Sequence, residues 1–234
     1  MGKITDLKVK SDEILVNPCT AISLLERSAR EAGLDTINTE RFYERTREAW
    51  IASVFLLALR KIEGNPWWFK VNSEKHLAPD VFAYKFLEFE PRKTRRLEKF
   101  IEVFRWVKNT KTTLIGEIEK KLNKHYPSSF TLVCYVMRKG KIKLAKINSK
   151  LRKIRPNSSE IWILGTSKQN PRDVLVGRVW PELLTTKINI DDECAILTEP
   201  KFLVPYRGYK KDLMYEKLGK TALLKPNFDV EDLS

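Results

Sequence analysis

The chain has 234 residues, of which 44 are Lys or Arg and 30 are Asp or Glu, so its formal net charge is +14. With 42% hydrophobic residues and only 9 Gly and 11 Pro, it is excluded from the disordered, collagen-like and low-complexity classes. A chain of this length can bury a core of its own. The positive charge is compatible with an anionic partner, nucleic acid being the commonest, and equally with a protein that is simply rich in lysine.

The cysteines, histidines and apolar runs limit the compartment and the metal chemistry. Cys19, Cys134 and Cys194 are odd in number and far apart, which argues against a disulfide framework or a zinc site and favours a reducing, cytoplasmic location. Because there are only 2 histidines, any metal is expected to be a hard cation held by carboxylates. Residues 1–10 lack the apolar core of a signal peptide. The longest apolar run, at 50–59, is too short to cross a bilayer, so no membrane partner is expected.

Two helices are expected in the N-terminal part of the chain. Residues 20–32 begin with a threonine that can cap a helix and are followed by a glycine. Residues 39–62 have the strongest helical pattern, which Gly64 and Pro66 bring to an end. The second half of this segment is apolar almost all round, as in a helix at the centre of a domain. Residues 6–16 alternate weakly, as in a strand or an arm.

From residue 66 onward the pattern changes to strands and then alternates with helices. The expected elements are strands at 66–71, 79–89 and 100–107, a charged connection at 91–99 between the last two, a helix at 112–124, a strand at 129–137, a helix at 141–154 and a strand at 160–164. An antiparallel beginning followed by βαβ crossovers predicts an α/β fold, with a central mixed sheet of about five strands flanked by helices.

The pattern is weaker beyond residue 165. Short strands are expected at 174–179, 188–197 and 202–204, and the acidic run at 191–193 is interpreted as an exposed turn. The predicted organisation is therefore an N-terminal arm and helix (residues 1–38), an α/β core (39–168) and a C-terminal appendage packed on the core (169–234).

Two carboxylates stand where neighbouring strands would bring them together. Asp80 follows a proline and opens the strand at 79–89, and Glu102 lies in the middle of an otherwise apolar strand. A buried carboxylate without a partner is costly, so Glu102 needs either a metal ion or a Lys or Arg from a neighbouring element. Mg²⁺ is held by a few carboxylates and supports phosphodiester hydrolysis. The more ordinary roles are a turn or capping aspartate at 80 and a buried ion pair at 102.

This order of elements resembles the PD-(D/E)XK, or restriction-endonuclease-like, nuclease superfamily. The resemblance covers residues 39–166: a leading helix, a hairpin with Pro-Asp on one strand and an acid on the next, and then α-β-α-β. It implies a Mg²⁺- or Mn²⁺-dependent endonuclease, in which Asp80 and Glu102 are catalytic and hold the metal. The family's lysine is expected two residues after the second acid, where this chain has Phe104. The motif is therefore incomplete.

Some members of that superfamily carry the lysine on a neighbouring element. The candidates here are Lys120 and Lys121, on the helix after the hairpin, and Arg105. Arg105 should point to the opposite face of its strand from Glu102, because side chains alternate along a strand. Only one of the two lysines can point toward the metal, and we choose Lys121, which is three residues after Ile118 on the apolar stripe.

The leading helix offers a further acid, as in some members of the superfamily. Glu44 and Glu48 lie one turn apart on one face of it. Pairing with arginines of the same helix on a solvated face is the more ordinary role for both.

Two basic segments are candidates for nucleic-acid binding. Residues 138–155 carry nine Lys or Arg and no acid, and their apolar stripe leaves the lysines on the remaining surface. The nine like charges repel one another. Phosphate contacts would offset that repulsion and release condensed counterions. The alternative is a surface that is rich in lysine for solubility. The expected hairpin tip is the second segment. The predicted contacts, which hold phosphate without reading bases, are Arg92, Lys93, Arg95, Arg96, Lys143, Lys146, Lys150 and Lys153.

The sequence therefore predicts a metal-dependent nuclease, with Mg²⁺ or Mn²⁺ as cofactor and nucleic acid, DNA in preference to RNA, as partner. One alternative is a catalytically inactive nucleic-acid-binding protein on the same fold, in which Phe104 reflects lost catalysis. Another is an interaction module for an acidic protein partner. A homodimer is compatible with each of them.

Overall fold

The computed structural model describes residues 14–40, 43–72, 79–90, 93–124, 126, 129–138, 140–196, 202–207 and 213–217. Its helices are α1 (Pro18–Ala32), α2 (Leu34–Thr39), α3 (Glu44–Glu63), α4 (Leu114–Leu122), α5 (Leu144–Ile154) and α6 (Ile190–Ala195). Its strands are β1 (Leu15–Val16), β2 (Trp68–Val71), β3 (Val81–Glu90), β4 (Lys93–Trp106), β5 (Phe130–Val136), β6 (Glu160–Thr166), β7 (Asp173–Trp180), β8 (Leu184–Asn189), β9 (Phe202–Arg207) and β10 (Leu213–Lys217).

The described strands form one open mixed sheet, in the order β10-β9-β1-β2-β3-β4-β5-β6-β7-β8. β4, β5 and β6 run parallel, joined by crossovers through α4 and α5, and the other neighbours are antiparallel. The predicted α/β class with a mixed sheet is confirmed. The expectation of about five strands is wrong, because β7 and β8 extend one side of the sheet and β1, β9 and β10 extend the other. Strands from the predicted arm, core and appendage thus all lie in this sheet.

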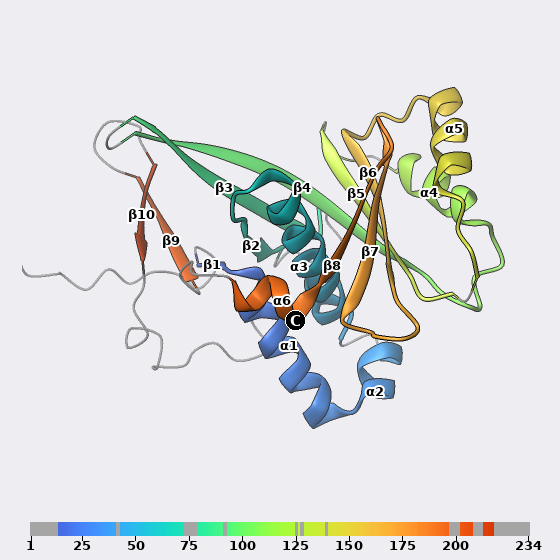
Figure 1. Cartoon of the computed structure of the whole chain (residues 1–234), viewed down its shortest axis with the longest axis horizontal. Helices are drawn as coiled ribbons and strands as arrows, with labels where there is room; N and C mark the ends of the chain where they lie inside the picture. The colour runs from blue at the N-terminus through green and yellow to red at the C-terminus, as the bar shows by residue number, and fades with distance from the viewer. Residues whose placement is uncertain are drawn as a thin grey trace, which may run out of the picture.

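Helices cover both faces of the sheet (Figure 1). α1, α3 and α6 pack on the face that carries Ile101 and Val103 of β4, and α4 and α5 pack on the face that carries Phe104. Alternate residues of one strand therefore belong to two different cores. α3 is the central buried helix that its composition predicts: its residues from Ile51 to Leu59 are at most 2% exposed.

The structure corrects three element boundaries. Residues 39–62 do not form one helix: α2 ends at Thr39 and α3 begins at Glu44. The strand expected at 188–197 divides into the end of β8 and the short helix α6. The Asn189 side chain accepts from the first amides of α6, and acids occupy its first turn, a favourable arrangement at a helix N-terminus. The acidic run is therefore a helix start rather than a turn.

The third correction concerns the expected basic hairpin tip. β4 begins at Lys93, so the segment predicted as a charged connection is a strand from that residue onward. The ladder with β3 extends from Val81↔Ile101 to Glu90↔Lys93. Arg96 pairs with Glu98 and lies over the Tyr84 ring. Arg92 lies outside the described residues, as do the side chains of Lys93 and Arg95.

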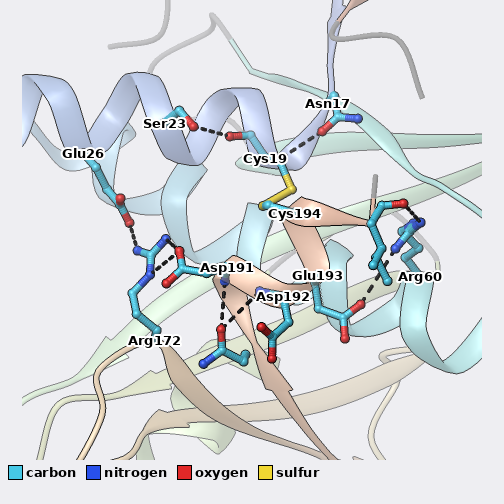
Figure 2. The surroundings of a disulfide bond; sticks show 12 residues. Asn17, Cys19, Ser23, Glu26, Arg60, Arg172, Asp191, Asp192, Glu193 and Cys194 are labelled. Carbon is cyan, nitrogen blue, oxygen red and sulfur yellow. Dashed lines mark hydrogen bonds and ion pairs between the residues drawn. A yellow bond between two sulfur atoms is a disulfide. The ribbon is translucent and has the colours of Figure 1, made fainter. Parts of the chain in front are cut away.

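A disulfide joins Cys19 of α1 to Cys194 of α6, with 5.5 Å between the Cα atoms (Figure 2). Beside it, Arg172 donates to Glu26 of α1 and to Asp191 of α6, so a salt bridge joins the same two helices. The expectation of unpaired cysteines is wrong for these two, whereas Cys134 is free and buried. A disulfide fits the reducing location expected from the sequence poorly. Among the described residues, no helix is long and apolar enough to span a membrane.

We expect reduction of this disulfide to destabilise the protein by about 2–4 kcal/mol, because the bond closes a loop spanning 175 residues and so restricts the unfolded chain. Urea unfolding with and without a phosphine reductant measures the change. The double variant Cys19→Ser/Cys194→Ser should match the reduced wild type and be insensitive to reductant. An identical unfolding midpoint for oxidised and reduced wild type would contradict the prediction.

Candidate active site

The candidate site lies where β3 begins and β4 continues beyond it. The first pair of the β3–β4 ladder is Val81↔Ile101, so β4 from residue 102 onward keeps β5 as its partner but has passed the start of β3. Asp80 stands immediately before β3, and its Oδ2 accepts a hydrogen bond of 2.8 Å from the backbone N–H of Val103. The Asp80 side chain thus satisfies a β4 amide at the point where the strand ladder ends.

Glu102 is one register step beyond that first pair, and so it lies across from Asp80. The residue is 6% exposed. Its Oε1 accepts from Lys121 Nζ at 3.0 Å and from the Tyr126 hydroxyl at 3.0 Å. The fold therefore brings Asp80, Glu102 and Lys121 together from three separate segments, and the buried acid has the charged partner that burial requires.

Phe104 and Lys121 meet at the position where the superfamily motif would place a lysine. Phe104 is two residues after Glu102 on the same face of β4 and is 8% exposed. The ammonium group of Lys121 lies 5.9 Å from the centre of the Phe104 ring. Lys121 can reach Glu102 because Ile118 and Leu122 fix α4 on the sheet. Lys120, its neighbour, is exposed.

α3 contributes a third carboxylate through an arginine. Arg45 Nη1 donates to Asp80 Oδ1 at 2.9 Å and to Glu48 Oε2 at 3.0 Å. The side chains of Arg45 and Glu48 are 14% and 16% exposed, so this pair is not the solvated surface pair that the sequence favours. Glu44, one turn earlier, is exposed.

Three acidic side chains lie close together here, and we call them the carboxylate cluster (Glu48, Asp80 and Glu102). Burial raises the pKa of Asp80 to about 6, and the charge of Glu102 adds to the effect. Burial also raises the pKa of Glu48 to about 7, with a further contribution from Asp80. Burial and the neighbouring Glu102 raise the pKa of the Tyr126 hydroxyl above its ordinary value. A hard divalent cation would relieve this repulsion, because it favours the ionised carboxylates.

The raised pKa values predict how the stability of the metal-free protein depends on pH. Between the ordinary carboxyl pKa near 4 and the values of 6 and 7, the folded state binds more protons than the unfolded chain. Stability is therefore expected to fall, by on the order of 1–3 kcal/mol, as the pH rises from 5 to 8. Thermal unfolding in EDTA measures this change, and Asp80→Asn should flatten it. The exposed control Asp192→Asn should retain the wild-type slope; a stability that rises with pH over this range would contradict the assignment.

A cavity of about 250 Å³ adjoins the cluster and is lined by Glu44, Glu48, Phe104 and Lys121, among others. In the described part of the chain, no three His, Cys, Asp or Glu side chains are placed to hold a metal ion as they stand. Arg45 and Lys121 neutralise the acids instead. The oxygen donors suit Mg²⁺ or Mn²⁺, but a cation can use them together only after Arg45 releases Asp80 and Glu48.

The basic helix α5 lines a groove on the same face of the sheet as Lys121. α5 buries Ile147 and Leu151, which leaves its lysines exposed. The groove, of about 350 Å³, lies between α5 and the start of α4, and Trp106 is one of its lining residues. Three of the lysines that the sequence predicts as phosphate contacts, Lys143, Lys146 and Lys150, line this groove. The fourth, Lys153, is exposed on the same helix. Arg138 lies over the Trp106 ring, 5.0 Å from its centre.

Sequence reasoning did not place two members of the site: it considered Arg45 only as a partner of Glu44 and Glu48 on a solvated face, and it did not single out Tyr126. Arg45 had a usable signal, because it is three residues before Glu48 on the same helix. Tyr126 had none, since it follows α4 in a segment without a pattern.

Comparisons with protein-family models, with curated proteins and with solved structures found no match to this chain.

Proposed function

We propose that this protein is a metal-dependent nuclease that hydrolyses phosphodiester bonds of nucleic acid on a restriction-endonuclease-like core. The observation that carries the proposal is the contact of 3.0 Å between Lys121 and Glu102, beside Phe104. Through this contact α4 brings an ammonium group to Glu102, which is followed by Phe104 where the motif has a lysine. The order β2-β3-β4-α4-β5, with α3 against the sheet, supports the same core.

Asp80, Glu102 and Glu48 are the residues that would hold the metal. When bound, Mg²⁺ or Mn²⁺ would lower the pKa of an attacking water and neutralise phosphate charge. Lys121 Nζ, beside Glu102, can donate to the water or to a phosphate oxygen as negative charge develops there. Tyr126 holds Glu102 Oε1 in place through its hydroxyl. Arg45, once it has released Asp80 and Glu48, remains available to pair with phosphate.

The groove between α4 and α5 is the proposed path for the nucleic-acid backbone. α4 carries Lys121 into the site and also forms one wall of the groove. α4 therefore connects the proposed path along the α5 lysines to the cluster that Lys121 completes. The phosphates of DNA and RNA can both bind these lysines, and we propose DNA as the substrate.

A non-catalytic nucleic-acid-binding protein is the second candidate. Arg45 and Lys121 already neutralise the acids in the described structure, as they would in a site that has lost its metal. An interaction module for an acidic protein would use the same exposed lysines of α5.

Cleavage assays separate these candidates. Circular single-stranded and double-stranded DNA and a labelled RNA are incubated with the protein in Mg²⁺, in Mn²⁺ and in EDTA. The nuclease proposal expects products with either cation and none in EDTA. Salt-dependent binding without cleavage on every substrate would favour the second candidate. Absence of both binding and cleavage would favour the interaction module.

A further inference from the structure

A second cavity lies behind the candidate active site, on the α3 side of the sheet. Its volume is about 490 Å³, within the roughly 300–1,000 Å³ typical of small-molecule sites. It is lined by α1, α2 and α3 and by the carboxyl ends of the parallel strands β4, β5 and β6. Its apolar lining includes Leu25, Ala29, Ile37, Trp50, Ile51 and Tyr135. Trp50 and Tyr135 meet edge to face, with ring centres 5.6 Å apart. The interior is thus suited to a flat, apolar group.

The charged residues around this cavity are mostly basic. Among its described lining residues, four are arginines (Arg30, Arg47, Arg105 and Arg172) and one, Glu26, is acidic. We call it the arginine-lined cavity. Because Arg47, Ile51 and Arg105 also line the 250 Å³ cavity beside the carboxylate cluster, the two cavities share a wall. A ligand in one therefore lies next to a ligand in the other.

Arg47 and Arg105 are fixed at that shared wall by carbonyl groups at the end of α2. Arg47 Nη1 donates to the carbonyls of Ile37 and Glu40, and Arg105 Nη1 donates to the carbonyl of Asn38 at 3.3 Å. Burial lowers the pKa of both guanidinium groups, and for Arg47 the positive charge of Arg105 lowers it further, whereas the nearby acids Glu44 and Glu48 act in the opposite direction on both. Two guanidinium groups held close together can share one bound phosphate through charge-assisted hydrogen bonds.

Two buried polar atoms at this wall lack a partner among the described residues. They are the hydroxyl of Thr46, a residue that is 2% exposed and lines the arginine-lined cavity, and Nε of Arg47. A buried donor without a partner is destabilising. A ligand with polar edges beside its flat body could satisfy such groups, whereas a purely aliphatic ligand could not.

We propose that the arginine-lined cavity binds one unpaired nucleotide of the substrate, with its base against Trp50 and Tyr135 and its phosphate at Arg47 and Arg105. This rests on the proposed function, and it deepens it by naming the substrate class. A base enters such a cavity only when it is out of the duplex, so strands with unpaired ends or flaps are preferred. The phosphate at the shared wall places the neighbouring phosphodiester toward the carboxylate cluster.

Binding in EDTA tests the inference without depending on catalysis. The probes are a labelled single-stranded 12-mer, an abasic 12-mer with the same phosphates, and the 12-bp duplex. The wild type is expected to bind the strand that has bases about tenfold more tightly than the abasic strand, in keeping with the contribution of one stacked base. Ala29→Phe fills the cavity while keeping every arginine, so it should remove this preference and leave abasic binding unchanged. Arg105→Gln should weaken binding of both strands.

The control Arg27→Gln makes the same charge change on the exposed face of α1, where the Arg27 side chain is 74% exposed, and should retain the preference. Circular dichroism checks that Ala29→Phe remains folded, and Arg105→Gln provides a second variant. Equal binding of the base-containing and abasic strands by wild type, or a preference that survives Ala29→Phe, would overturn the inference. Cleavage assays decide the proposed function separately, because a base preference in EDTA can stand when no cleavage occurs.

Discussion

Asp80→Asn and Glu102→Gln are each expected to reduce Mg²⁺-dependent cleavage by about 10³-fold or more, while binding in EDTA changes little. Both substitutions keep the shape of the side chain. Asparagine can still accept from the Val103 amide, and glutamine can still accept from Lys121 and Tyr126. The lost quantity is the negative charge that would hold the metal. Single-turnover cleavage rates and isothermal titration with Mn²⁺ measure the two effects.

Lys121→Ala should slow cleavage by about 10²–10³-fold without abolishing Mn²⁺ binding, because its ammonium group acts on developing charge rather than on the metal. Lys120→Ala is the matched control: it removes the same charge one residue earlier, from an exposed position. Its rate should remain at the wild-type level. Cleavage that persists in Asp80→Asn, or that needs no divalent cation, would exclude this mechanism.

Replacing Lys143, Lys146, Lys150 and Lys153 with glutamine is expected to flatten the salt dependence of nucleic-acid binding. Each phosphate contact contributes a slope of about −0.9 to log K against log salt on duplex DNA and about −0.7 on a single strand. Four lost contacts should therefore reduce the slope by about 3.6 or about 2.8, respectively. Fluorescence anisotropy between 50 and roughly 300 mM salt covers the useful range.

Arg27→Gln with Lys168→Gln is the control for this experiment, since both residues are exposed and belong to other parts of the surface. It should leave the slope unchanged. An unchanged slope in the fourfold lysine variant would move the binding surface away from α5, most directly to the β3–β4 ribbon.

Local sequence patterns were sufficient to predict most helices and strands of the core. The apolar stripe Leu114, Ile118 and Leu122 predicted α4, and the basic amphipathic pattern predicted α5. The near-continuous apolar run of β5 is typical of a strand covered on both faces. These elements were predictable because each buries its own side chains against a broad surface. The break between α2 and α3 was not predicted; there Arg47 of α3 donates to the carbonyls of Ile37 and Glu40, a contact between segments that no local pattern shows.

Pro-Asp before one strand and an acid in the next were visible in the sequence, and so was a lysine one residue before the end of the α4 stripe. The sequence could therefore identify Asp80, Glu102 and Lys121 as candidates. Their meeting depends on the register Val81↔Ile101, which places Asp80 across from Glu102, and on the crossover that lays α4 on that face. Register and crossover are set by packing over the whole sheet, and no local pattern encodes them.

The sequence by itself determined the charge, the amphipathic helices, the α/β order and the chemical types available for a site. Only the tertiary structure decided which of them meet: Arg45 with Asp80 and Glu48, Cys19 with Cys194 across 175 residues, and the extension of the sheet by terminal strands. The physical reason is the range of the interactions. Helical periodicity and capping act over a few residues, whereas ion pairs, disulfides and strand neighbours join segments that only the completed fold brings within a few ångströms.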